Sequence, residues 1–166
     1  MSGATLTMEG MEAIQRGLRE LPEVAERELL ATMTAATLLA QREVMERTPR
    51  VTGLTARSIT SDAYRTPLGV EGTVSSSQIS MVAVELGTKA HMPPVEALVP
   101  WVRAVLGVAP KDAKRVAWLV ARKIARRGTK AQAPMARTMA EIEGQVVALF
   151  EAAAGRIGAQ LMGGAA

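Results

Sequence analysis

The sequence contains no cysteine, which excludes disulfides, thiolate metal ligands and cysteine nucleophiles. Aromatic residues make up only 2% of the 166 residues, so few side chains are left for stacking on nucleic-acid bases or sugars. His91 is the only histidine, and a metal site built from several histidines is therefore excluded. No signal peptide and no apolar run of the roughly 18 to 20 residues of a membrane span are visible. These absences predict a soluble protein of a reducing compartment.

The remaining composition is that of a folded protein, with 48% hydrophobic and 22% charged residues. Alanine, valine, leucine and ten methionines must fill its core. The length predicts one domain over residues 1–166, with loose termini at residues 1–7 and 162–166. A net charge of +4 and a pI near 10.0 permit contact with nucleic acid or with an acidic partner.

Helical periodicity dominates the first third of the chain. Apolar residues recur every three or four positions from Met8 to Leu21, and Pro22 is expected to begin a new helix. The stripe then continues to the stop at Thr48-Pro49 through Leu29, Met33, Ala36, Ala40 and Val44. We therefore expect a long N-terminal helix.

A change to a shorter period follows, rich in serine, threonine and β-branched residues. Three strands are predicted, at 54–64, 68–75 and 79–86. The turns between them fall at Pro67-Leu68-Gly69 and Ser75-Ser76-Ser77. This pattern predicts a small antiparallel β-meander, whose last strand ends at Gly87.

Three further helices are predicted after Pro93-Pro94. The first begins near Val99, because Pro100 disfavours an earlier start, and ends at Gly107. The second is capped by Gly128 and has an apolar face of Ala113, Val116, Ala117, Val120 and Ile124. The last begins near Pro134, with a stripe of Met135, Met139, Ile142, Val146, Phe150, Ala153, Ile157 and Leu161. Helices, a meander and more helices define the α+β class.

Few residues suggest chemistry. His91 lacks a recognisable nucleophile and an orienting carboxylate, which favours a loop or interface role over general-base catalysis. Gly87-Thr88-Lys89 and Gly128-Thr129-Lys130 resemble the end of a phosphate-binding loop, but both lack its first glycine and its glycine-lysine step. The carboxylates of Asp62, Glu71 and Glu85 follow no metal-binding spacing and are expected to be solvated or paired.

One dense basic patch lies near the end of the second predicted C-terminal helix. Part of this charge needs no partner, because a helix C-terminus favours cations. The patch is either a solvated surface or a contact for DNA or for an acidic partner. Its members are Arg122, Lys123, Arg126, Arg127 and Lys130.

Four short motifs in order give a resemblance to a known family. After the long helix, Pro49, Thr52, Gly53, Leu54, Ser58 and Ile59 follow "P-x-x-T-G-x-L-x-x-S-I" with one shortened spacing. Val84, Glu85, Gly87 and Thr88 then match "V-E-x-G-T", and Pro93-Pro94 leads into Trp101-Val102. Finally, Ile124, Gly128, Thr129 and Pro134 follow "I-x-x-x-G-T-x-x-x-P" with one additional residue before the proline. Over residues 8–150 the chain resembles the tail-completion or head-tail joining proteins of long-tailed bacteriophages. This is the gene-product-ten-like family, which includes the lambda minor tail protein Z group.

The sequence departs from that family at Met81 and Met135, where members often carry aromatic residues. The resemblance implies a structural virion protein of the phage neck, assembled in the host cytoplasm, with no catalytic residues and no cofactor. It implies a hexameric ring with a DNA channel, between the head-tail connector or adaptor and the tail terminator or tail-tube protein. The strand-end turn is then a candidate interface, made of Glu85, Gly87, Thr88, Lys89 and His91.

Two other function classes stay open. A small basic DNA-binding protein could act through the patch from Arg122 to Lys130 without forming a ring. An enzyme is the least favoured class, because no catalytic constellation is recognisable.

Overall fold

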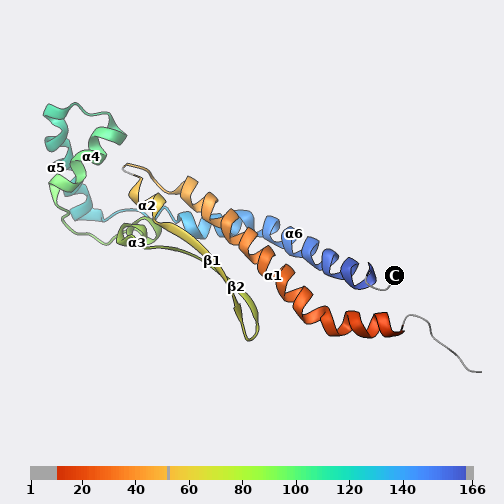
Figure 1. Ribbon diagram of the computed structural model, residues 1–166. Helices are drawn as coiled ribbons and strands as arrows, with labels where there is room; N and C mark the ends of the chain where they lie inside the picture. The colour runs from red at the N-terminus through yellow and green to blue at the C-terminus, as the bar shows by residue number, and fades with distance from the viewer. Residues whose placement is uncertain (1–10, 52, 164–166) are drawn as a thin grey trace, which may run out of the picture. The chain divides into compact units, whose positions relative to one another are not determined.

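The computed structural model describes residues 11–51 and 53–163, with the side chains of 22–51 and 53–160. Its elements in chain order are α1 (Met11–Arg47), α2 (Leu54–Arg57), β1 (Ile59–Thr66), β2 (Gly69–Ser76), α3 (Ile79–Leu86), α4 (Val95–Leu106), α5 (Pro110–Arg127) and α6 (Pro134–Gly163) (Figure 1). The α+β class is thus confirmed, with a long N-terminal helix and C-terminal helices. Residues 1–7 and 164–166 of the predicted loose termini, and Thr52 of the first family motif, lie outside the described residues.

Helix α1 is continuous through Pro22, so the predicted helix start at that residue is wrong. It ends at Arg47, directly before the predicted stop. Ala36, Ala40 and Val44 of the predicted stripe are buried, which confirms the helical periodicity there. The stripe predicted from Met8 to Leu21 lies outside the described side chains.

The two strands form one antiparallel hairpin, and the expected turn at Pro67-Leu68 joins them. The first predicted strand starts too early, because residues 54–57 form the short helix α2. Gly53 precedes this helix in a left-handed conformation with φ 74°, which favours glycine.

The third predicted strand is wrong, because Ile79–Leu86 forms helix α3. Its alternating valines fit a strand, but a short apolar run of this kind also fits a helix. The helical backbone turns Met81 into a buried cluster with Val44 and Ile59, and this burial decides the conformation. The meander is therefore a hairpin followed by a helix.

Helices α4 and α5 pack together as a pair joined by the short segment 107–109. Ala113 and Ala117 are buried against Val102, and their small side chains allow the helices to approach closely. Helix α4 begins at Val95 and contains Pro100, so the predicted start near Val99 is wrong. Helix α4 ends before Gly107, which has φ 64°, so the predicted end of this helix is confirmed.

Helix α6 begins at Pro134, as predicted, and Ile142 and Ala153 of its stripe are buried. Met139 is 56% exposed, in contrast to the prediction. The buried position beside it is Thr138, which is fully buried. Its hydroxyl has no hydrogen-bond partner among the described residues.

The chain divides into two compact units. Unit 1 comprises Met1–Leu39, Ser61–Thr73 and Ile142–Ala166, and unit 2 comprises Ala40–Thr60 and Val74–Glu141. In unit 1 the hairpin approaches α1 closely at Gly72, where a Cβ atom would collide with the side chains of Thr37 and Met33. Helix α6 is tied to α1 in this unit by an Arg156–Glu28 ion pair of 2.8 Å. Within the described part of the chain, no helix is long and apolar enough to cross a membrane.

Candidate functional site

The two Gly-Thr-Lys segments of the sequence pair with each other in unit 2. The backbone amide of Thr88 donates to the carbonyl of Thr129, and that of Thr129 donates to the carbonyl of Thr88, both at 3.1 Å. Their hydroxyls lie 3.0 Å apart and share a hydrogen bond. We call this antiparallel bridge, formed by residues 87–89 and 128–130, the Gly-Thr-Lys junction.

Glycine is required on both sides of the junction. Gly87 follows α3 with φ 71° and ψ −174°, and Gly128 follows α5 with φ 68° and ψ −159°. This region of backbone conformation is occupied almost only by glycine. A Cβ atom at Gly87 would overlap the carbonyl oxygen of Thr129, and one at Gly128 would overlap that of Thr88. The glycines therefore allow the two segments to touch.

Glu85 connects the junction to helix α6. Its carboxylate oxygens accept hydrogen bonds from the backbone amides of Met135 and Ala136, each at 2.9 Å. A carboxylate at this helix end satisfies two unpaired donors and complements the helix dipole. The carbonyl of Val84 also accepts a bond from the amide of Gln132. Glu85 thus has a structural role.

The other two candidates of the turn remain at the surface. Lys89 and His91 are exposed. His91 Nδ1 lies 2.9 Å from the carbonyl oxygen of Lys89, a local contact with no carboxylate in it. Of the predicted interface residues, Glu85, Gly87 and Thr88 support the junction, while the side chains of Lys89 and His91 are exposed.

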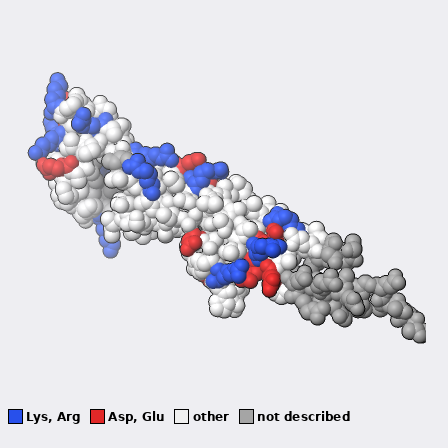
Figure 2. Space-filling view, viewed as in Figure 1, with Lys and Arg blue, Asp and Glu red and all other residues white. Residues whose placement is uncertain are grey.

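The basic patch is exposed throughout. The guanidinium of Arg122 stacks over the ring of Trp118, 4.7 Å from its centroid. Arg122, Arg126 and Leu119 line one shallow groove together with Lys123 and Arg127. Lysine and arginine side chains gather over the α4–α5 pair on the face that Figure 2 shows.

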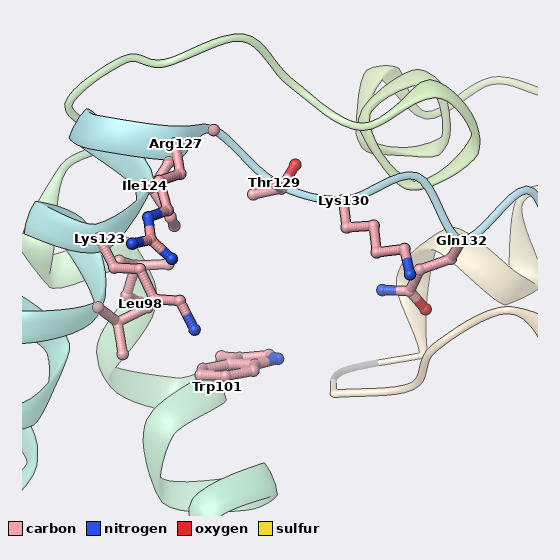
Figure 3. A pocket seen from close by; sticks show the side chains of 10 residues that line it. Leu98, Trp101, Lys123, Ile124, Arg127, Thr129, Lys130 and Gln132 are labelled. Carbon is pink, nitrogen blue, oxygen red and sulfur yellow. The ribbon is translucent and has the colours of Figure 1, made fainter.

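A second groove, of about 580 Å³, lies beside the first and shares Lys123 and Arg127 with it. The ring of Trp101 lies at this groove, with Lys123 and Arg127 on one side and Lys130 and Gln132 on the other (Figure 3). We call it the Trp101 groove. Its lining residues are Leu98, Trp101, Val120, Lys123, Ile124, Arg127, Gly128, Thr129, Lys130 and Gln132.

Sequence reasoning missed Trp101 as a site residue. Trp101 belongs to α4, whereas the basic patch belongs to α5 and the segment after it. The packing of α4 on α5 brings them to the same groove, so no local motif could reveal the combination. The one available signal was that both tryptophans of this aromatic-poor chain, Trp101 and Trp118, come shortly before the basic patch in the sequence.

The strand carboxylates Asp62 and Glu71 have separate, local partners. Asp62 accepts a bond from the amide of Ala63, and Glu71 accepts one from the hydroxyl of Tyr64 at 2.9 Å. The second bond, which stabilises the protonated phenol, raises the pKa of Tyr64. Among the described residues no cluster of three or more acidic or histidine side chains could hold a metal ion.

No family model, no curated protein and no solved structure matches the chain.

Proposed function

We propose that this chain is a structural subunit of a bacteriophage neck. In this role it forms a homo-oligomeric, hexameric ring that joins the DNA-filled head to the tail and leaves a channel for DNA. The observation that carries the proposal is the Gly-Thr-Lys junction. The motif residues come from two segments that are far apart in the sequence: Glu85, Gly87 and Thr88 in one, and Gly128 and Thr129 in the other. They contact one another or the start of α6. Because these motif residues shape the backbone and do not form a catalytic site, they support a resemblance to a family of structural proteins.

The two departures from the family pattern lie close together in the fold. Met81 and Met135 replace residues that are often aromatic, and both belong to the core cluster around Val44 and Ile59. Long, flexible methionine side chains can together fill the volume that aromatic side chains occupy elsewhere. Both departures therefore lie in one core cluster of unit 2.

Helix α3 exposes an apolar stripe that suits association of copies. Ile79, Val82 and Leu86 are 87%, 56% and 74% exposed, and their spacing places them along one side of the helix. Burying large aliphatic side chains contributes about 1.5 to 3 kcal/mol each, so this face favours a covering partner. A neighbouring copy is the partner that a ring supplies.

The charge of the chain is unevenly divided, which favours association of unlike surfaces. Unit 2 has 15 of the 20 Lys and Arg residues and 6 of the 16 Asp and Glu residues, giving it +9 and leaving −5 for unit 1. Unlike charges on two copies attract, and a head-to-tail arrangement of this kind closes into a ring when the rotation permits.

The self-association is tested on the α3 stripe. Ile79→Glu and Leu86→Glu should abolish the assembled species in sedimentation velocity while leaving the circular dichroism spectrum unchanged, because a charge cannot be buried in the contact. Leu68→Glu is the control, since Leu68 in the hairpin turn is equally apolar and 100% exposed. Loss of assembly in all three variants, or in none, would argue against a contact through α3.

The neck role needs a separate experiment. In virions, or in prophage-induced particles, the protein should be found at the junction of head and tail by antibody labelling. It should also crosslink to the connector or adaptor on one side and to the tail terminator or tail-tube protein on the other. Particles that join normally without this chain would contradict the role and favour a small DNA-binding protein instead.

A further inference from the structure

We propose that the Trp101 groove is a binding site for single-stranded nucleic acid. Phosphates would lie against Lys123, Arg127 and Lys130, and a base would stack on the indole of Trp101. This inference goes beyond the neck proposal and does not depend on it, because it concerns only residues of the α4–α5 pair and the segment that follows.

The positive charge around the groove is not neutralised by ion pairs among the described residues. Helix α5 has seven lysines and arginines against a single acidic residue, Asp112. Lys114 of this helix pairs with Glu96 at 3.2 Å, but among the described residues no ion pair involves any member of the basic patch. Uncompensated cations on one surface attract a polyanion, and releasing its counterions strengthens the binding.

The groove also has an apolar wall, which the binding of a phosphate group alone would not require. Leu98, Val120 and Ile124 line it together with the indole of Trp101. A flat aromatic ring between cationic side chains is the arrangement that binds unpaired bases, since every base offers a π-face and is followed by a phosphate. The amide of Gln132 at the rim can donate to and accept from a base edge.

The cations continue past the groove, which favours a polymer over a small anion. Arg122 and Arg126 line the neighbouring groove, which shares Lys123 and Arg127 with the first. A strand lying across both grooves would pass all five cations of the basic patch. Duplex DNA could use the same charges, but its bases are stacked on each other and cannot cover Trp101. An acidic peptide would match the charge but lacks a regular planar group.

Tryptophan fluorescence tests the site directly, because the chain has only two tryptophans. In a Trp118→Phe background Trp101 is the only tryptophan fluorophore, and oligothymidylate at low salt should quench it. In a Trp101→Phe background Trp118 reports on the surface beyond the groove. Removing the platform by Trp101→Leu should weaken binding about tenfold, as expected when one base can no longer stack.

A second test of the site removes positive charges from the groove. The double variant Lys123→Gln/Arg127→Gln should lower the log-log salt slope of binding by about 1.4, roughly 0.7 for each phosphate that the protein no longer neutralises. The double variant Lys111→Gln/Arg115→Gln removes the same charge from the same helix, at exposed residues outside both grooves, and should leave the slope nearly unchanged.

Four outcomes would overturn the proposal. The first is that oligothymidylate fails to quench Trp101 at low salt, and the second is that the two double variants change the salt slope equally. The third is that a duplex of the same length binds as tightly as oligothymidylate. The fourth is that polyglutamate at matched charge displaces oligothymidylate. The last two would assign the groove to duplex DNA or to an acidic protein segment. The quenching measurement uses Trp101 itself and stays decisive if Trp101→Leu fails to fold.

Discussion

Thr88 and Thr129 donate their backbone amides to each other's carbonyl oxygens, both at 3.1 Å, although the two residues are 41 positions apart. Each follows a glycine that ends a helix and precedes a lysine. The chain therefore uses the same three residue types twice, at the two ends of one contact. This contact holds the segment after α3 against the segment after α5. The second of these segments continues into α6.

The glycines of the junction should tolerate no side chain. Gly128→Ala should cost at least about 3 kcal/mol of unfolding free energy, because the new methyl group adds a collision with Thr88 to an unfavourable backbone conformation. Gly107→Ala is the control: Gly107 also has a positive φ, but apart from its neighbours in the chain no atom of the described residues lies within 4 Å of its added Cβ. It should cost only about 1 to 2 kcal/mol. Equal shifts in the two urea unfolding curves would show that the junction is not tightly packed.

The carboxylate of Glu85 should stabilise the first turn of α6. Glu85→Ala removes the acceptor of two backbone amides and should cost about 1 to 2 kcal/mol, as for other helix caps. Hydrogen exchange at Met135 and Ala136 should accelerate in this variant. The exposed Glu46 provides a control, and Glu46→Ala should change stability by less than about 0.5 kcal/mol. Unchanged exchange at the start of α6 would contradict the capping role.

Replacing Thr138 should raise stability. Its buried hydroxyl has no partner in the part of the chain that the structure describes, so Thr138→Val removes an unsatisfied polar group and should stabilise the fold by about 1 kcal/mol. Thr48 is the matched control, for which the same substitution is expected to change stability in the opposite direction. It is also buried, but its hydroxyl donates to the carbonyl of Val44 at 2.7 Å. Thr48→Val should therefore destabilise the fold, and thermal unfolding that shifts in the same direction in both variants would contradict this explanation.

Unit 1 should lose stability in acid through Glu28. The hydrogen bond from Arg156 holds the pKa of Glu28 below its ordinary value of 4.5. Because the folded pKa is lower than the unfolded one, the stabilisation is present above about pH 4.5 and is lost as the pH falls through the folded pKa. Arg156→Gln should reduce stability at neutral pH and flatten its decline in acid. Urea unfolding of both proteins across this range measures the difference, and parallel pH profiles would exclude the contribution of this pair.

The sequence could predict those parts of the fold that depend on long periodic stretches and on chain-breaking residues. The buried stripe of Ala36, Ala40 and Val44 and the cap at Gly107 are of this kind. Ile79–Leu86 could not be assigned from its pattern, because eight residues match both the strand and the helix period. Its helical state depends on the burial of Met81 against residues distant in the sequence.

Of the candidate site, only the basic patch could be predicted from the sequence. A run of cations close together in the sequence identifies the basic patch without knowledge of the fold. The pairing of Thr88 with Thr129, and the position of Trp101 beside Lys123, both depend on how distant segments pack. Each Gly-Thr-Lys segment by itself resembles an incomplete phosphate loop, and only their contact shows that they act as a pair.

We propose that copies of this chain assemble into a closed ring, and native mass spectrometry of the purified protein tests this proposal most directly. We expect one closed species of fixed copy number, a hexamer, with few open intermediates, alone or with its neck partners present. Its dissociation at high salt should follow from the opposite net charges of unit 1 and unit 2. A mass of one chain at every concentration, with the connector and the tail terminator present, would contradict the ring.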